Sequence, residues 1–218
     1  DLVCGNYPIL PVMSRFGIAM GFGDRTIGQV CRDRGVDTDT FLTVVNLLLD
    51  EEKQNAEKDY VFSVGALLDY LHKSHDYFLG FRFPAIRCKL VAAIDCSADV
   101  SQAILRYYDE YADEVQKHMA YEERTVFPYV RDLLAGERPA GGYRIGIFRS
   151  RHDQIEARLT ELKNIIIKYC PADSSDVLND VLFDIFACER DLASHNYIED
   201  HLFVPAVEEL ERKTGADR

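Results

Sequence analysis

The 218 residues are 47% hydrophobic and 28% charged, which suits one substantial buried core in a soluble globular protein. The formal net charge of −12 argues against the basic surface that nucleic acid or an anionic membrane requires. The sequence has no apolar run of membrane-spanning length and no signal-peptide pattern, so we expect no nucleic-acid partner and no membrane.

Residues 1–55 predict a small helical N-terminal domain. A hydroxyl at Thr26 is a suitable cap for the second of its helices, and glycines follow the first two. The three short helices are expected at about residues 8–16, 26–35 and 37–49. So small a unit needs cover for its apolar face, which docking on the rest of the chain or a homodimer would give. The polar run at 50–59 predicts a linker.

Residues 60–214 predict a second, longer helical domain, because apolar residues recur there at spacings of three and four. Its four helices are expected at about residues 63–94, 97–134, 143–169 and 175 onward. Pro84 is expected to kink or break the first helix. No alternating β-branched run competes with helix. The fold class is therefore predicted to be all-α, with an up-down four-helix bundle after the small N-terminal domain.

Two stretches in this second domain share one pattern: a His, a Glu four residues later and a Pro ten residues later. A single His precedes each stretch by the same interval, 43 residues. Such regularity among only six histidines indicates a duplicated helical hairpin. The residues of the pattern are His75, His118, Glu122, His152, His195 and Glu199.

The spacing predicts a metal site. Residues four apart share a helix face, so an imidazole and a carboxylate can reach the same small volume. Glu123 and Asp200, one residue further on, point around the helix and are poorer ligand candidates. Four helices that each supply inward ligands are the way di-iron sites are built in bundles. A nitrogen and oxygen donor set favours iron or manganese, and less often zinc.

The donor count bears on the chemistry. Four imidazoles and two bridging carboxylates, with one oxo or hydroxo bridge, leave roughly one open position on each of two octahedral metals. Open positions indicate dioxygen, nitric oxide or peroxide as ligands. A structural zinc bundle is the alternative.

Other polar residues near the pattern are assigned less firmly. Glu114 and Asp191 lie four residues before His118 and His195, and they are either ordinary polar helix positions or groups that orient an imidazole. The remaining histidines, His72 and His201, have no counterparts in the repeat and are expected not to be ligands. The six cysteines contain no CxxC motif and are expected to be free thiols in a reducing cytosol.

The six-residue set resembles that of the hemerythrin-like, HHE cation-binding bundles. With four His and two Glu it resembles, in particular, the di-iron proteins that repair iron centres, over about residues 60–211. Residues 4 to about 50 also resemble the small N-terminal domain of that family, chiefly in Arg15-Phe16-Gly17-Ile18 and Gly23-Asp-Arg-Thr26. The family carries Cys-Cys-Gly-Gly at the turn where this chain has Gly21-Phe22-Gly23.

The resemblance implies a cytoplasmic protein of the nitrosative or oxidative stress response that holds two non-haem iron ions. Its implied activities are aid to iron–sulfur cluster repair, with iron–sulfur proteins as partners, and reaction with nitric oxide or dioxygen. Absence of the vicinal thiols shifts weight toward a dioxygen or nitric oxide sensor or store without turnover. Enzymatic activity, as a nitric oxide reductase or a peroxidase-type enzyme with Glu114 or Asp191 relaying protons, stays open.

Overall fold

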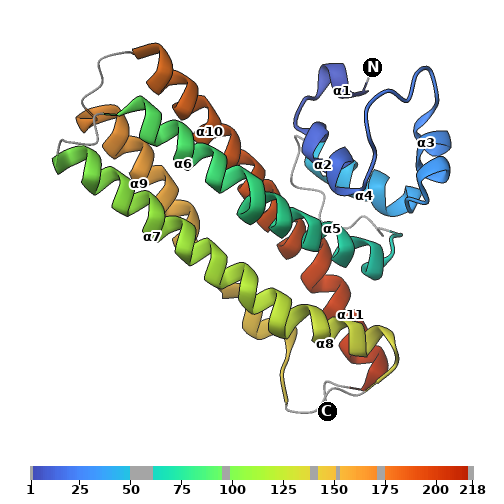
Figure 1. The fold of residues 1–218 in the computed structure, drawn as a ribbon. Helices are drawn as coiled ribbons and strands as arrows, with labels where there is room; N and C mark the ends of the chain where they lie inside the picture. Colours follow the sequence, from blue (N-terminus) through green and yellow to red (C-terminus); the bar gives the residue numbers. More distant parts are fainter. Residues whose placement is uncertain are drawn as a thin grey trace.

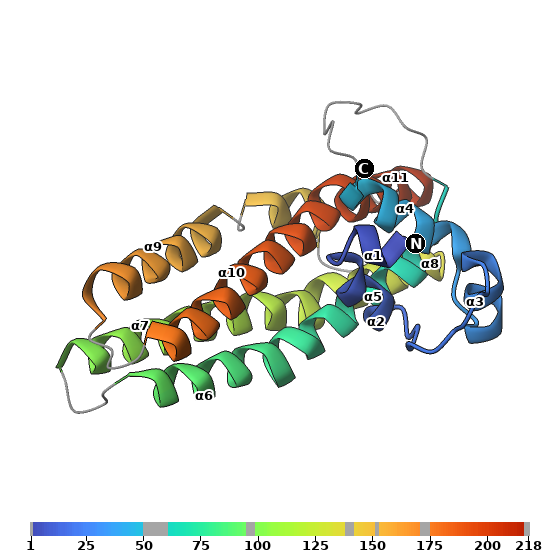
Figure 2. The ribbon, with the colours of Figure 1, turned by 90° about the horizontal axis from the view of Figure 1, so that it is seen from above.

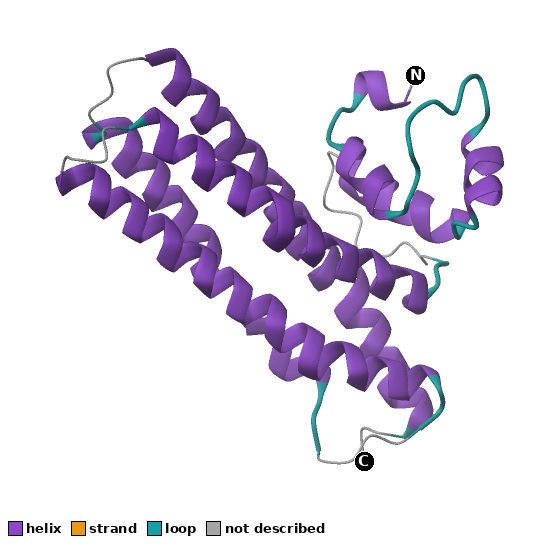
Figure 3. Cartoon of the chain, viewed as in Figure 1, coloured by secondary structure: helices purple, strands orange, loops and turns teal. Residues whose placement is uncertain are grey.

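A computed structural model describes residues 2–49, 61–94, 99–137, 142–150, 153–170 and 175–215. All regular elements within these ranges are helices, joined by loops, and no strand occurs among them (Figure 3). The prediction of an all-α fold is confirmed. None of the helices in the described ranges is long and apolar enough to cross a membrane.

The N-terminal unit consists of four short helices, of which the last three match the predicted ones. Their bounds are α1 (Leu2–Gly5), α2 (Ile9–Arg15), α3 (Ile27–Arg34) and α4 (Thr38–Leu49). Helix α3 begins with a capping box, because the Thr26 hydroxyl accepts from the backbone N–H of Gln29 while the Gln29 side chain accepts from the backbone N–H of Thr26. It ends at Gly35, whose φ of 65° is one that glycine adopts without strain.

The bundle is formed by α6, α7, α9 and α10, which lie alongside one another in both views (Figures 1 and 2). Each neighbouring pair packs directly. The elements are α5 (Val64–Tyr77), η1 (Phe78–Arg82), α6 (Phe83–Ala93), α7 (Asp99–Tyr121), η2 (Glu122–Val126), α8 (Phe127–Leu134), η3 (Ile145–Ser150), α9 (Asp153–Tyr169), α10 (Ser175–Ile198), η4 (Glu199–Phe203) and α11 (Val204–Thr214).

Three of the long helices contain a π-helical turn just before a proline. In η1, η2 and η4 the residue ahead of the proline donates its backbone N–H five residues back, as from Phe83 to Phe78. Proline lacks an N–H and its ring crowds the carbonyl four residues earlier, and a wider turn relieves that conflict. Of the two outcomes expected at Pro84, a kink or a break, the break is wrong: the helix continues from α5 through the π-helical turn η1 into α6.

The predicted helix at 143–169 is also corrected at its start, where residues Ile145–Ser150 form the 3₁₀ helix η3. A buried carboxylate explains the difference. Oε1 of Glu211 accepts the backbone N–H of Ile145 at 2.9 Å and the hydroxyl of Tyr129 at 2.6 Å. The Glu211 carboxylate, which belongs to α11, therefore holds the backbone N–H of Ile145 in place. Ser97, where the second bundle helix is expected to begin, and Pro171, just past the expected end of the third, lie outside the described residues.

Two clusters of apolar side chains form the core. The first joins the N-terminal unit to α5, α8 and α11, and the second fills the far half of the bundle. Phe16 of the N-terminal unit exemplifies the join, since its ring lies 4.9 Å from that of Tyr70 on α5 and 5.4 Å from that of Phe41 on α4. The N-terminal unit therefore docks on the bundle and shares a core with it.

Candidate metal centre

Four side chains from four different elements converge between the two apolar clusters. His75 comes from α5, Glu122 from η2, His195 from α10 and Glu199 from η4. One donor atom of each lies within 4.8 Å of the others. The residues are 3%, 0%, 2% and 0% exposed in that order, so the cluster is closed to bulk water.

Glu122 lies between imidazoles from two different helices. Its Oε2 is 2.8 Å from Nε2 of His75, and its Oε1 is 2.8 Å from Nε2 of His118 on α7. The second His-x3-Glu pair has the same spacing along its helix, and Oε1 of Glu199 is 3.2 Å from Nε2 of His195. The helical spacing of four thus places each His-x3-Glu pair as the sequence predicts.

The atoms approach like ligands of a shared ion. Within the described part of the chain, neither oxygen of Glu122 nor Nε2 of His75 makes a hydrogen bond of acceptable geometry, although they lie within contact distance. A buried carboxylate without compensation costs several kcal/mol. A divalent cation supplies that compensation, and imidazole nitrogens with carboxylate oxygens are its usual donors. The residues present therefore fit a metal ion.

The electrostatics of His75 reflect the same crowding. Burial alone lowers the pKa of His75, but contacts with Glu122 and Glu123 outweigh it and raise this pKa to about 9. A proton and a metal ion compete for Nε2 of this imidazole, so the raised pKa of His75 opposes metal uptake as the pH falls.

Glu123 holds the other nitrogen of His75. Its Oε1 lies 2.8 Å from Nδ1 of His75 and 2.9 Å from Nδ1 of His72. Burial raises the pKa of Glu123, but both histidines lower it, and the net shift is downward. A carboxylate on the outer nitrogen fixes the ring orientation and tautomer of a ligating histidine. This role of Glu123 could not be predicted from the sequence, because the pattern gives the face on which Glu123 lies but not that α5 packs against it.

Aromatic rings fix the planes of the imidazoles. The His75 ring stacks on Phe127 at 5.3 Å with an interplanar angle of 6°, and the His118 ring on Phe148 at 6.0 Å and 7°. His195 meets the Phe78 ring edge-on at 6.0 Å. Phe127 and Phe148 belong to the first apolar cluster and Phe78 belongs to the second. The two clusters therefore pack against different imidazoles from opposite sides of the centre.

The other predicted residues are placed as follows. His152, the fourth predicted imidazole, lies outside the described residues. His201 is exposed, and its Nδ1 is 2.9 Å from the carbonyl oxygen of Tyr197. Glu114 pairs with Arg158 at 2.7 Å, and Asp191 pairs with an arginine of the N-terminal unit.

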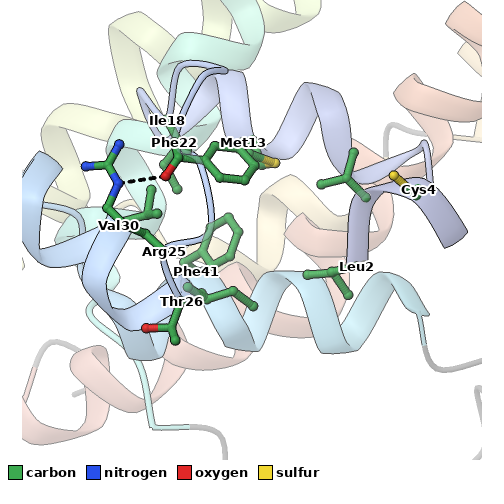
Figure 4. A pocket seen from close by; sticks show the side chains of 11 residues that line it. Leu2, Cys4, Met13, Ile18, Phe22, Arg25, Thr26, Val30 and Phe41 are labelled. Carbon is green, nitrogen blue, oxygen red and sulfur yellow. Dashed lines mark hydrogen bonds between the residues drawn. The ribbon is translucent and has the colours of Figure 1, made fainter.

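A separate apolar cavity of about 340 Å³ lies within the N-terminal unit (Figure 4). The Phe22 side chain, from the turn between two glycines, points into this cavity together with that of Phe41. The backbone carbonyl oxygen of Phe22 accepts a hydrogen bond from Nε of Arg25 at 2.7 Å. Cys4 also lines this cavity. The cysteines in the described ranges are free thiols, namely Cys4, Cys31, Cys88, Cys170 and Cys188.

The helical bundle and its buried cluster of His and Glu define a metal-binding protein of hemerythrin type. Comparison with family models agrees: the hemerythrin HHE cation binding domain matches residues 66–207, more than half of the chain, and the match spans the whole cluster. The chain belongs to the hemerythrin HHE cation-binding family. No curated protein matches it.

Proposed function

We propose that the protein is a non-haem di-iron protein that reacts with nitric oxide or dioxygen in the cytoplasmic response to nitrosative or oxidative stress. The position of the buried Glu122 carboxylate between two imidazoles of different helices carries the proposal. A carboxylate so placed can bridge two ions. The cluster found in the described residues contains nitrogen and oxygen donors and no thiolate, a set that suits iron.

The family implies the metal, and the residues that would hold two iron ions are His75, His118, Glu122, His152, His195 and Glu199. Iron held there would supply redox equivalents and exchangeable coordination positions for a small ligand. The chain supplies the surroundings. Phe78, Phe127 and Phe148 are fully buried around the imidazoles and keep water away. Such a shell favours small uncharged molecules over charged substrates.

Aid to iron–sulfur cluster repair is the second part of this proposal, and it rests on the resemblance of the N-terminal unit to that of iron-centre repair proteins. The turn at residues 21–23 bears on it. Where those proteins carry vicinal thiols, this chain places Phe22, which lines an apolar cavity. Iron transfer through such thiols is not available here. This observation favours the alternative function, a sensor or store for dioxygen or nitric oxide without turnover.

The proposal is tested first by metal content and absorption spectra. We expect the full chain, loaded anaerobically with ferrous iron, to hold two irons and to develop new absorption bands on exposure to dioxygen or nitric oxide. The double variant Glu122→Ala/Glu199→Ala should lose the dinuclear stoichiometry while its circular dichroism keeps the helical signal. The assignment would be refuted if that variant still bound two metals. It would also be refuted if the wild-type chain bound one zinc and its absorption spectrum did not change with either gas.

Repair and sensing differ in the fate of the iron. If the protein supplies iron, the oxidised form should reconstitute a cluster-depleted iron–sulfur protein in the presence of sulfide and a thiol reductant. If it is a sensor or store, gas binding should be reversible on removal of the gas, and the iron should stay bound.

A further inference from the structure

Arg15 of the N-terminal unit is buried where this unit packs against the bundle. The residue is 4% exposed, and its Nη1 and Nη2 atoms donate to the two carboxylate oxygens of Asp191 on α10 at 2.8 and 2.6 Å. This bidentate pair is the strongest geometry that a guanidinium and a carboxylate form. The end of α2 is thereby fixed to the middle of α10.

The same guanidinium is surrounded by aromatic rings of the neighbouring helix. Its Cζ lies 5.0 Å from the ring centroid of Phe78, 5.1 Å from that of Tyr77 and 6.0 Å from that of Tyr70. Burial lowers the pKa of Arg15, but Tyr70 and Asp191 raise it further than burial lowers it, so the group stays charged. The electrostatic attraction between a buried cation and aromatic ring faces adds to the ion pair with Asp191. Arg15 therefore connects α10 with α5 and η1.

Two of these partners lie close along the chain to two of the imidazoles. Asp191 lies one helical turn before His195 on α10, and Phe78 lies one turn after His75 along α5 and η1. The Phe78 ring is in addition 6.0 Å from the His195 ring. A shift of α5 against α10 moves the two imidazoles relative to each other. Arg15 opposes that shift, together with Arg82 of η1, which donates to the carbonyl oxygen of Asp184 on α10 at 2.8 Å.

Beside Arg15, a cavity of about 230 Å³ lies between the two units, lined from the N-terminal unit by Pro11 and Leu48 and from the bundle by Tyr77 and Asp191. A second polar link crosses there, because Nη1 of Arg190 on α10 donates to the hydroxyl of Tyr7. Tyr7 is 63% exposed, so the Arg15–Asp191 pair is the buried link of the two.

We propose that Arg15 is a positioning residue of the metal centre: it locks α5 to α10 so that His75 and His195 face the same ions, and the docked N-terminal unit thereby controls how fast metal leaves. The inference rests on the proposed metal site. Without the guanidinium the Asp191 carboxylate is buried without its partner and must move toward water. A lost supporting interaction around a metal site typically costs about 10- to 100-fold in metal affinity.

The test uses the full chain loaded with Co²⁺, whose visible bands report ligand geometry, and follows transfer of the metal to a chelator. Arg15→Met removes the charge at similar length, Arg15→Lys keeps it, and Asp191→Asn breaks the pair from the other side. Arg87→Met is the matched control, because Arg87 makes a bidentate pair with Asp109 between α6 and α7 that is exposed.

We expect Arg15→Met and Asp191→Asn to release Co²⁺ about 10- to 100-fold faster than wild type with altered visible bands. Arg15→Lys should recover part of the loss, and Arg87→Met should match wild type. Release at the wild-type rate with unchanged bands in either variant of the pair overturns the inference, as does equal acceleration by Arg87→Met. A wild-type chain that takes up no Co²⁺ refutes the metal site itself, a result that the metal content shows separately.

Discussion

At the scale of single residues, the centre depends on carboxylates that serve different purposes within one turn of helix. Glu122 is fully buried and contacts two imidazoles, whereas Glu123 is partly exposed and contacts the outer nitrogen of His75. The difference arises from the 100° rotation between neighbouring residues on a helix. Glu122 therefore faces the inside of the bundle and Glu123 the side on which α5 packs.

Replacement of Glu123 by Gln should weaken the metal centre without removing a ligand. The neutral amide is a poorer acceptor for the Nδ1–H of His75, so the imidazole becomes a weaker and less well oriented donor. We expect metal affinity to fall by about 10- to 100-fold, measured by competition with a chelator.

Glu114→Gln is the matched control for that prediction, because Glu114 lies on the same helix, four residues before His118. Glu114 is paired with Arg158 near the surface, so its replacement should change metal affinity by less than about threefold, the scale of an exposed ion pair. Equal losses in the two variants would show that the contact between Glu123 and His75 does not support the site.

At the scale of the elements, caps and prolines set where each helix begins and how it turns. Thr26 closes a capping box at the start of α3, a feature readable from a hydroxyl residue before a helical stretch. The three π-helical turns accommodate prolines in helices that continue. Two of these turns begin with the proposed ligands Glu122 and Glu199, so the wider turn lies within the candidate centre.

Thr26→Ala should destabilise the protein by about 1 kcal/mol, because the backbone N–H of Gln29 loses its acceptor. The free energy of unfolding in urea measures this loss. Thr214→Ala is the comparison, since that hydroxyl donates back to the carbonyl oxygens of Leu210 and Glu211 in its own helix and its loss should cost little. A loss as large for Thr214→Ala as for Thr26→Ala would contradict the capping argument.

At the scale of the whole molecule, the N-terminal unit and the bundle share one apolar cluster. Phe16 and Phe41 from the first and Tyr70 from the second are members of it. A unit of about 50 residues buries too little apolar surface to be stable alone, so it gains its stability from the bundle. The buried Arg15–Asp191 pair adds a directional link across the same seam.

The shared core predicts one cooperative unfolding transition for the metal-free chain. Calorimetry should show a single peak, and Phe16→Ala, which empties the contact between the units, should lower the stability of the whole by about 3–5 kcal/mol. Leu134→Ala is the control, because this leucine is 44% exposed and its loss should be small. Two separated transitions, with only the first shifted by Phe16→Ala, would show that the units unfold independently.

Most of the helices, and the pairing of each His with its Glu, can be predicted from the sequence. Both follow from local rules: periodicity and caps fix helices such as α3, and the spacing of four places His118 beside Glu122. Pro84 is an exception, since a proline inside a helical pattern predicts a kink or a break, whereas the helix continues there through the π-helical turn η1.

Which helix faces meet is visible only in the folded chain. Glu123 became a partner of His75 because α5 packs on that side, and Asp191 became the anchor of Arg15, 176 residues away in sequence. Contacts between residues so far apart depend on how whole helices pack, and one sequence carries no periodic signal for them. The 3₁₀ start at Ile145 has the same cause, since the carboxylate that fixes it belongs to Glu211.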